Sequence, residues 1–261
     1  MLKLMPTDET TPAIPRPAKQ RVHEARVVLS DLDGCLAAGN VALEGAVELA
    51  RQLVDRLYLV SNNSSHDAPS LSQELAAHGL EIPAQRIVLA GILAVDTIAR
   101  RWPGCRIMVC GSSALRCQAQ NLGLTVADRE VDVVLVARDI SFDYRRLEAA
   151  ANALADGAHL VAANPDGTHP GLHGRLVPET GALLAAIRAC VPNHPCTTVG
   201  KPEPAIFQEA LDLAGCDAAD AIMLGDNPAT DIAGARALGM DAVLLGNHPD
   251  AEVGSVAELV A

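Results

Sequence analysis

The feature that most constrains the fold is an alternation of short apolar runs, rich in β-branched residues, with alanine-rich stretches of helical periodicity. We expect strands at 26–30, 57–61, 106–110, 131–137, 159–163, 221–225 and 241–246. We expect helices near 44–55, 68–78, 91–101, 112–121, 142–155, 179–190, 203–214 and 229–238. Strands that alternate with helices form parallel sheets covered on both faces. The sequence therefore predicts a doubly wound α/β fold, whose ligands bind beyond the carboxyl ends of the strands.

The composition allows a large core and argues against a polyanionic partner. A chain of 261 residues suffices for two domains, or for one domain with a large insertion. Hydrophobic residues make up 49% and aromatic residues only 2%, so few rings are available to stack on bases or sugars. The net charge of −12 argues against nucleic acid or an anionic membrane as partner.

The cysteines and the N-terminal residues indicate a cytoplasmic protein. The seven cysteines are an odd number and form no CxxC pair, which suits free thiols in a reducing compartment. The N-terminal residues lack the long apolar stretch of a signal peptide or membrane span. Residues 1–22 are rich in proline and polar residues, and we expect them to form a mobile tail.

Polar side chains gather in four clusters, three of them directly after an expected strand. The clusters are Asp31 and Asp33 in SDLDG, Ser61 and Asn62 in LVSNNSS, Lys201 in VGKPEP, and Asp226 and Asp231 in LGDNPATD. Each cluster alone is typical of an ordinary turn or helix cap. A doubly wound sheet, however, would bring all four clusters to one edge, where their side chains can form a single site.

Together these residues supply what phosphoryl transfer requires. A carboxylate can attack phosphorus and form an aspartyl-phosphate. Asp31, Asp226 and a backbone carbonyl form a hard oxygen set suited to Mg²⁺. Ser61 and nearby amide groups can bind phosphate oxygens, and Lys201 offers a point charge to the same oxygens. The sequence therefore predicts that the first two aspartates are a nucleophile and its proton-transfer partner.

The four clusters resemble, in their order and spacing, the motifs of the haloacid dehalogenase superfamily of phosphohydrolases. DLDG resembles the first motif, SNN the second, GKP the third and GDNPATD the fourth, over roughly residues 26–246. About 115 residues separate the second motif from the expected helix near Glu179, and they carry their own strand and helix alternation. This insertion is similar to the large α/β cap of the p-nitrophenylphosphatase and NagD-like subgroup. Asp139, Phe142 and Tyr144, then AANPDGTHP and PETGALLAAI, fit that cap.

The resemblance implies a domain organisation and a role for each motif residue. The Rossmann-like core would comprise residues 23–80 and 181–261, with the α/β cap domain at 81–180. Asp31 would be the nucleophile and a Mg²⁺ ligand, and Asp33 would be the acid and base whose carbonyl also binds the metal. Ser61, Asn62 and Lys201 would bind the phosphoryl group. Asp226 would ligate Mg²⁺ directly, and Asp231 would act close by, through water bound to the metal.

Two residues depart from the family pattern. Cys35 stands where the superfamily often has Thr or a branched aliphatic residue, and its thiol is a weak hydrogen-bond donor. We expect less support for the loop and a sensitivity to oxidation, with activity retained. Ser30, before the nucleophile, is smaller and more polar than the usual residue.

The resemblance also implies that the cap sets substrate specificity. The candidates are His66, Asn164, His169, His173 and Arg175, which are equally typical of a solvated loop. Arg175 or a histidine would contact the leaving group or a second anionic group. Because aromatic residues are few, we expect a small phosphorylated metabolite, such as a sugar phosphate or phosphoglycolate, over nucleotides or pyridoxal phosphate. A homodimer through the cap is a further expectation by resemblance.

Three other functions are open to this residue set. A phosphomutase would pass the phosphoryl group to a sugar hydroxyl, but superfamily mutases usually carry a small helical cap between the first two motifs. A receiver domain also uses an acidic pair, a hydroxyl and a lysine, but it has about half this length. A non-catalytic phosphate-binding or regulatory protein would have lost part of the acidic set, and Asp33 first.

Overall fold

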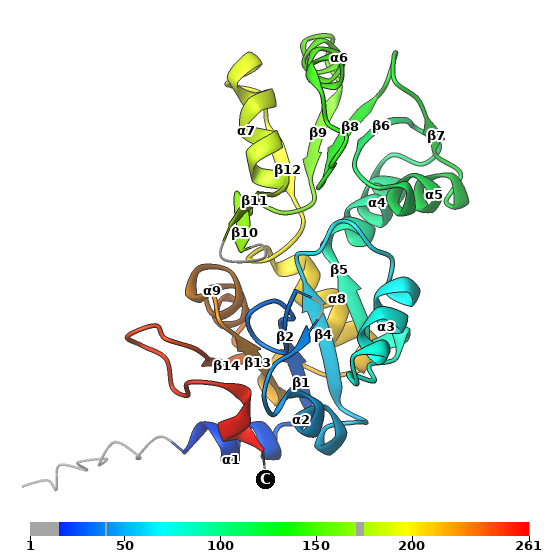
Figure 1. The fold of residues 1–261 in the computed structure, drawn as a ribbon. Coiled ribbons are helices and arrows are strands. Elements are labelled where there is room, and N and C mark those ends of the chain that lie inside the picture. The colour runs from blue at the N-terminus through cyan, green and yellow to red at the C-terminus, as the bar shows by residue number, and fades with distance from the viewer. Residues whose placement is uncertain (1–15, 40, 171–174, 261) are drawn as a thin grey trace, which may run out of the picture.

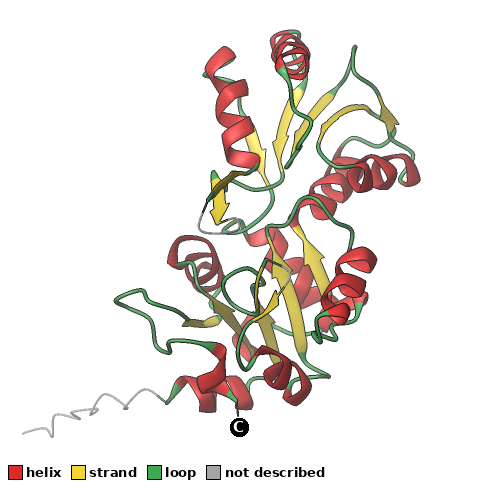
Figure 2. Cartoon of the chain, in the orientation of Figure 1, coloured by secondary structure: helices red, strands yellow, loops and turns green. Residues whose placement is uncertain are grey.

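The protein contains two parallel five-stranded sheets in the computed structural model, which describes residues 16–39, 41–170 and 175–260 (Figures 1 and 2). The first sheet has the order β14-β13-β1-β4-β5. Its strands are β1 (Val27–Ser30), β4 (Leu57–Ser61), β5 (Ile87–Leu89), β13 (Ala221–Gly225) and β14 (Asp241–Leu244). Each neighbouring pair is parallel, as expected for a doubly wound sheet.

Helices cover both faces of the first sheet, because its strands are apolar on both sides. These helices are α1 (Ala18–Glu24), α2 (Ala46–Gln52), α3 (Ala68–Ala77), α8 (Pro204–Ala214) and α9 (Ala233–Ala237). Helices α8 and α9 pack in one apolar cluster with Leu29, Val60 and Met223. Helices α1, α2 and α3 pack in a second cluster with Val28 and Leu59. Alternate residues of the same strands thus enter opposite layers, which is the pattern expected of buried parallel strands.

The second sheet has the order β12-β9-β8-β6-β7 and is also parallel. Its strands are β6 (Arg106–Cys110), β7 (Thr125–Val126), β8 (Val133–Val136), β9 (His159–Ala162) and β12 (Cys196–Thr198). One face packs against α4 (Ala90–Arg101) and α5 (Ser113–Asn121). The other face packs against α6 (Tyr144–Ala155) and α7 (Thr180–Cys190). The inserted α/β cap is therefore confirmed as a second layered unit above the core (Figure 1).

Two strands lie on the other side of the expected domain boundaries at 80 and 181. β5 pairs with β4 of the first sheet, although the sequence predicts residues 81–180 as cap. β12 pairs with β9 of the second sheet, although it follows residue 181. We therefore propose that the cap extends from about the end of β5 to the end of β12. Residues 87–89 run into α4 without an intervening turn, so they have no sequence signal of a separate strand.

A helix begins inside the segment that the sequence predicts as a tail. Residues 18–22 belong to α1, where Val22 is fully buried and Ala18 nearly so. Arg21 holds this helix to Asp241 at 2.5 Å and also pairs with Glu252. The tail prediction is therefore wrong for residues 18–22, since burial of one helix face outweighs their polar composition. Residues 1–15 of the predicted tail lie outside the described residues.

Short elements complete the two units. A small hairpin after the first motif pairs β2 (Ala37–Ala38) with β3 (Val41–Ala42), and a second, in the cap, pairs β10 (Thr168–Pro170) with β11 (Leu176–Pro178). The short helices of the described residues are three 3₁₀ helices, η1 (Ala84–Arg86), η3 (Ala218–Asp220) and η5 (Val256–Leu259), and one π-helix, η4 (Pro228–Ile232). Within the described residues, no helix has the length and apolar character needed to cross a membrane.

Candidate active site

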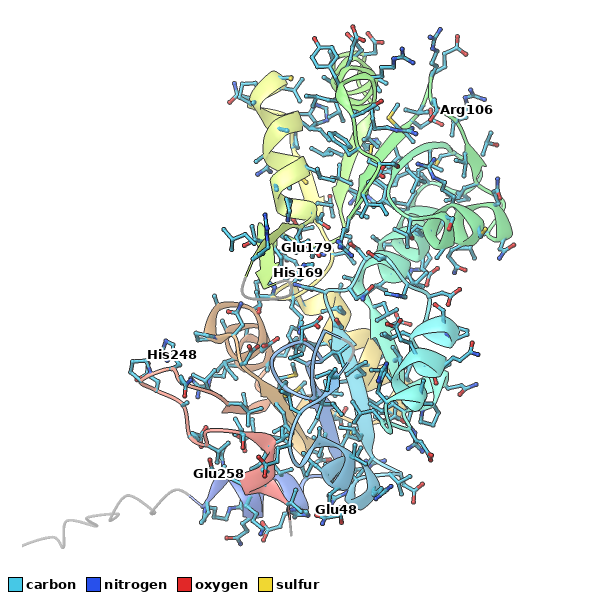
Figure 3. The ribbon with its side chains drawn as sticks, viewed as in Figure 1. Glu48, Arg106, His169, Glu179, His248 and Glu258 are labelled. Carbon is cyan, nitrogen blue, oxygen red and sulfur yellow. The ribbon has the colours of Figure 1, made fainter. Side chains whose placement is uncertain are left out.

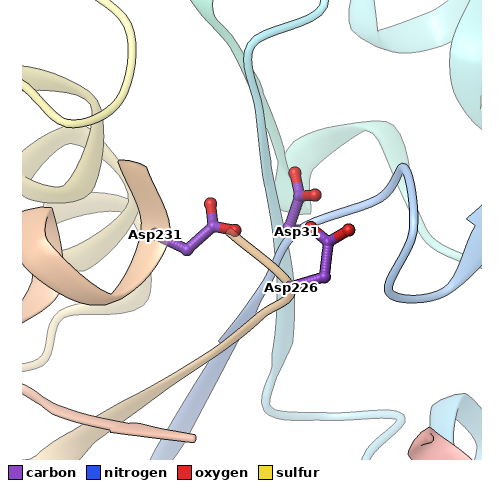
Figure 4. A group of neighbouring side chains, drawn as sticks. All are labelled: Asp31, Asp226 and Asp231. Atoms are coloured by element: carbon purple, nitrogen blue, oxygen red, sulfur yellow. The ribbon is translucent and has the colours of Figure 1, made fainter. Parts of the chain in front are cut away.

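Three carboxylates meet at the carboxyl edge of the first sheet, facing the cap. Asp31 directly follows β1, Asp226 directly follows β13, and Asp231 lies in η4 (Figure 4). Each offers an oxygen within 4.8 Å of the others. The structure thus brings these three predicted site residues together, because adjacent parallel strands end side by side.

Lys201 reaches this cluster from the segment after β12 and is 2% exposed. Its Nζ lies 2.5 Å from Asp31 Oδ1 and 2.7 Å from Asp231 Oδ1. Burial alone would lower the pKa of Lys201, but attraction to Asp231 and Asp31 outweighs burial and raises it. The ammonium group therefore stays charged and links the first and fourth motifs.

The carboxylates outnumber the cation, and the excess negative charge shifts their titration. Burial, the largest cause, raises the pKa of Asp31 to about 8, with Asp231 and Asp226 adding to it and Lys201 opposing it. Burial and then the charge of Asp231 raise the pKa of Asp226 to about 6. Burial and the neighbouring carboxylates thus oppose the ionisation of Asp31, and a further positive charge beside Lys201 would favour its carboxylate form.

The site fits a divalent cation in charge and donor type. Three carboxylates against one ammonium leave a net charge of minus two when all are ionised, and carboxylate oxygens are the ligands that Mg²⁺ prefers. Gly34, with φ +84°, brings the loop backbone against Asp226, because a Cβ there would lie 2.1 Å from Asp226 Oδ2. The loop is therefore shaped around this carboxylate and leaves no room for a side chain.

Asp33 lies in the loop after Asp31, on the side of the site that faces the cap. Its side chain is accessible to solvent, while the Asp33 backbone forms an isolated bridge with Ala37. Partial burial, the largest cause, raises the pKa of Asp33, against the opposing charges of His169, Lys201, His66 and Arg138. A raised pKa suits a carboxyl group that must donate a proton.

Ser61 and Asn62 end β4 and differ in what their side chains do. Ser61 is 2% exposed, and its hydroxyl accepts a hydrogen bond from the Asn63 backbone N–H at 3.1 Å, which leaves its own proton to donate. Asn62 Oδ1 accepts from the Lys201 backbone N–H at 2.7 Å, and Asn62 Nδ2 donates to the Lys201 carbonyl at 3.1 Å. The Asn62 side chain thus holds Lys201 in place, and only its backbone N–H remains for the phosphoryl group.

Asn164 and Asp166, which follow β9, hold Asn62 from the cap side. Asn164 is fully buried and donates from Nδ2 to the Asn62 carbonyl at 2.6 Å. Asp166 Oδ2 accepts from Asn62 Nδ2 at 3.0 Å. Asn164, a predicted specificity residue, therefore has a positioning contact with the second motif in place of a free side chain.

Of the other predicted specificity residues, two histidines contact neighbouring side chains, one arginine is exposed, and one histidine lies outside the described residues. His169 lies on β10, at the boundary between cap and core, and its Nδ1 is 2.8 Å from Glu179 Oε1 (Figure 3). His66 Nε2 pairs with Glu74 at 3.2 Å, and its Nδ1 contacts the Asn63 side chain. Arg175 is exposed just before β11. His173 lies outside the described residues.

Sequence reasoning overlooked Arg138, which lies two residues after β8, the central strand of the second sheet. Its Nε lies 3.3 Å from Glu179 Oε1, the oxygen that also contacts His169. The sequence signal was its place at the carboxyl end of an expected strand, next to the more conspicuous Asp139. Asp139 Oδ1 accepts from the backbone N–H and hydroxyl of Ser141, so this aspartate organises its own turn.

The two departures from the family pattern contact each other. Ser30 Oγ donates to the Asp31 carbonyl at 2.8 Å and lies 3.3 Å from Cys35 Sγ. Burial, the largest cause, raises the pKa of the Cys35 thiol well above its ordinary value, and Asp31 contributes in the same direction. A buried and protonated thiol is unreactive, which argues against the expected sensitivity to oxidation.

Comparison with known proteins identifies the family. A family model described as haloacid dehalogenase-like hydrolase matches residues 28–125, and a second model of HAD-like hydrolases matches residues 198–258. The ribonucleotide monophosphatase NagD of Escherichia coli K12 is 32% identical over 222 residues, which are 84% of this chain and 86% of that protein. The chain belongs to the haloacid dehalogenase-like hydrolases.

Solved structures agree with this assignment over nearly the whole chain. The p-nitrophenyl phosphatase from Archaeoglobus fulgidus superposes with a TM-score of 0.82 at 27% identity and covers 91% of this chain and 98% of that one. A glycerol phosphate phosphatase from Mycobacterium tuberculosis, solved with calcium, has a TM-score of 0.82 at 29% identity, covering 92% of this chain and 74% of that one. The resemblance to the p-nitrophenylphosphatase and NagD-like subgroup is confirmed, and the chain is an enzyme of the phosphatase class.

Proposed function

We propose that the protein is a Mg²⁺-dependent phosphomonoester hydrolase that acts through an aspartyl-phosphate on Asp31. The observation that carries this proposal is the buried contact of Asp31 with Lys201, beside Asp226 and Asp231. A nucleophilic carboxylate, a fixed cation and an acidic cation site thus occupy one point at the sheet edge. The related glycerol phosphate phosphatase was solved in complex with calcium, which supports a divalent cation in this family.

The residues divide the reaction into two steps. Asp31 Oδ attacks phosphorus, so that a bond forms between this oxygen and phosphorus while the bond from phosphorus to the ester oxygen breaks. Asp33 gives its proton to the departing oxygen, which its raised pKa favours. Asp33 then accepts a proton from the water that attacks phosphorus, and the bond to Asp31 breaks as inorganic phosphate leaves.

The remaining motif residues would bind the phosphoryl oxygens and the metal ion. Lys201 Nζ, the Ser61 hydroxyl and the Asn62 backbone N–H would bind the phosphoryl oxygens. Asp31, Asp226 and the Asp33 carbonyl would hold Mg²⁺, which supplies positive charge beside the nucleophile and the phosphoryl group. Asp231, whose two oxygens contact Lys201 and the Asn227 backbone N–H, would act close to the metal through water.

The substrate that we propose is a small phosphorylated metabolite. The related proteins are named for ribonucleotide monophosphates, p-nitrophenyl phosphate and glycerol phosphate. Few aromatic side chains are available to sandwich a base, which favours sugar phosphates, phosphoglycolate or similar compounds over nucleotides.

The test is phosphate release from p-nitrophenyl phosphate and a panel of metabolite phosphates, which includes nucleoside monophosphates, with Mg²⁺ and with EDTA. The proposal predicts release that depends on Mg²⁺ and disappears in Asp31→Asn, whose amide keeps the size of the carboxylate but is not a nucleophile. Release that persists in EDTA, or in Asp31→Asn, would contradict it. No release from any ester would favour a mutase or a non-catalytic phosphate binder.

A further inference from the structure

Arg138 is fixed beside the active site by contacts from both units. Its backbone N–H donates to Ser64 Oγ at 2.9 Å, which ties the end of β8 to the loop after the second motif. Ser64 is 2% exposed, and its hydroxyl also lies 3.2 Å from Thr180 Oγ1 at the start of α7. The backbone of Arg138 is therefore held against the core by a buried hydroxyl, independently of its side chain.

The guanidinium group of Arg138 has one ion-pair contact and keeps hydrogen-bond donors without an acceptor. Its Nε faces Glu179 Oε1 at 3.3 Å, and its side chain is 30% exposed. The Nε contact is an ion pair without a hydrogen bond, and among the residues that the structure describes none accepts a hydrogen bond from the two terminal nitrogens. A comparable cap arginine, Arg146, has a terminal nitrogen paired with Asp128. Arg138 therefore keeps the planar pair of donors that binds a carboxylate or phosphate in a bidentate way.

Two histidines near Arg138 have one or both ring nitrogens in contact with other side chains. His66 has both ring nitrogens in contact with Glu74 and Asn63. His169 contacts Glu179 through Nδ1, on the same oxygen as Arg138, so the glutamate orients both side chains (Figure 3). Ser64, whose hydroxyl accepts from the Arg138 backbone, lies two residues after Asn62, which contacts the Lys201 backbone, so Arg138 lies next to the second motif of the site.

We propose that Arg138 binds a second anionic group, a carboxylate or a phosphate, on the leaving group of the substrate, with Glu179 holding the guanidinium in position. This inference rests on the proposed function and narrows its substrate class to phosphomonoesters that carry a second negative charge. In a chain with a net charge of −12, an arginine with free terminal nitrogens at the cap–core boundary is the feature that selects such a substrate.

The experiment compares matched esters on wild type and Arg138→Gln. For the carboxylate arm the pair is 3-phosphoglycerate and glycerol 3-phosphate, which differ by a carboxylate in place of a hydroxymethyl group. For the phosphate arm the pair is ethylene glycol bisphosphate and 2-hydroxyethyl phosphate. Arg138→Lys keeps the charge without the planar fork, and Arg146→Gln is the matched cap control because its arginine pairs with Asp128.

We expect Arg138→Gln to lower kcat/KM for the doubly anionic ester of one arm by about 10- to 100-fold, the range of a hydrogen bond to a charged group. The loss should fall mainly on KM, and Arg138→Lys should restore part of it. Turnover of p-nitrophenyl phosphate should change little in Arg138→Gln, which also shows that the variant folds, and Arg146→Gln should resemble wild type on every ester. The arm that responds identifies the anionic group.

Two results would overturn the inference, and they are distinct. If wild type hydrolyses the esters but Arg138→Gln lowers kcat/KM equally for both members of each pair, or for neither, Arg138 does not bind a second anion. If wild type releases phosphate from no ester with Mg²⁺, the proposed function fails first, and this inference fails with it.

Discussion

Replacing Lys201 by methionine tests the charge balance of the buried cluster. Methionine fills a similar volume without charge, so Asp31 and Asp231 lose the ammonium group that lies 2.5 and 2.7 Å away. Removing one partner of a buried ion pair costs about 3–5 kcal/mol of unfolding free energy. For a chain of this size that corresponds to a fall in melting temperature of roughly 6–20 °C.

The assay is thermal unfolding in EDTA at pH 8 and at pH 5, followed by circular dichroism. Protonation of Asp31 and Asp231 removes negative charge that Lys201 no longer balances. The variant should therefore lose less unfolding free energy at pH 5 than at pH 8, by at most about 1.4 kcal/mol per pH unit for each carboxylate. Lys19→Met is the control, because Lys19 is exposed on α1 and such a change stays within about 0.5 kcal/mol. A melting temperature of Lys201→Met equal to that of Lys19→Met at pH 8 would refute the reasoning.

Three further predictions concern the loop, the nucleophile and the thiol. Gly34→Ala should lower turnover at least about 100-fold by displacing Asp226, the metal ligand that we propose, whereas Gly39→Ala, with a similar positive φ and nothing within 4 Å, should keep turnover near wild type. Equal turnover in the two variants would contradict this. In EDTA, the pKa of Asp31 in the folded state is about 8, above its ordinary value of 3.8. The free energy of unfolding should therefore fall as pH rises from about 4 to about 8, and melting curves recorded across this range should show the fall. Asp31→Asn or added Mg²⁺ should make the fall smaller. Iodoacetamide should label the exposed Cys117 and leave the buried Cys35 unmodified in the folded protein, as peptide mass spectrometry would record, and early labelling of Cys35 would disprove its burial.

The fold could be predicted from the sequence wherever burial leaves a strong local pattern. The long apolar strands were predicted near their observed ends, because buried parallel strands are continuously hydrophobic. The three-residue strands β5 and β12 were missed, since a run that short has no period of its own. The helix α1 was missed because its proline-rich context outweighed the spacing of Ala18 and Val22, which are four residues apart on one helix face.

The site was predictable where residues follow strands in the same sheet, and not where contacts cross between units. Asp31 and Asp226 could be brought together from topology alone. The pairing of Asn62 with the Lys201 backbone could not, because it joins residues that are 139 positions apart through a tertiary contact. Arg138 was likewise hidden, since its significance depends on Glu179 and Ser64, which lie on other elements. The homodimer through the cap stays a prediction.

The most direct test of the central claim is to trap the phosphorylated residue. The enzyme with Mg²⁺ and p-nitrophenyl phosphate is quenched in acid within its first turnovers and reduced with borohydride, which converts an aspartyl-phosphate to homoserine, and its peptides are then analysed by mass spectrometry. The account predicts homoserine at position 31, and none in the EDTA sample or in Asp31→Asn. Rapid turnover with no homoserine at position 31, or with homoserine at another aspartate, would contradict it.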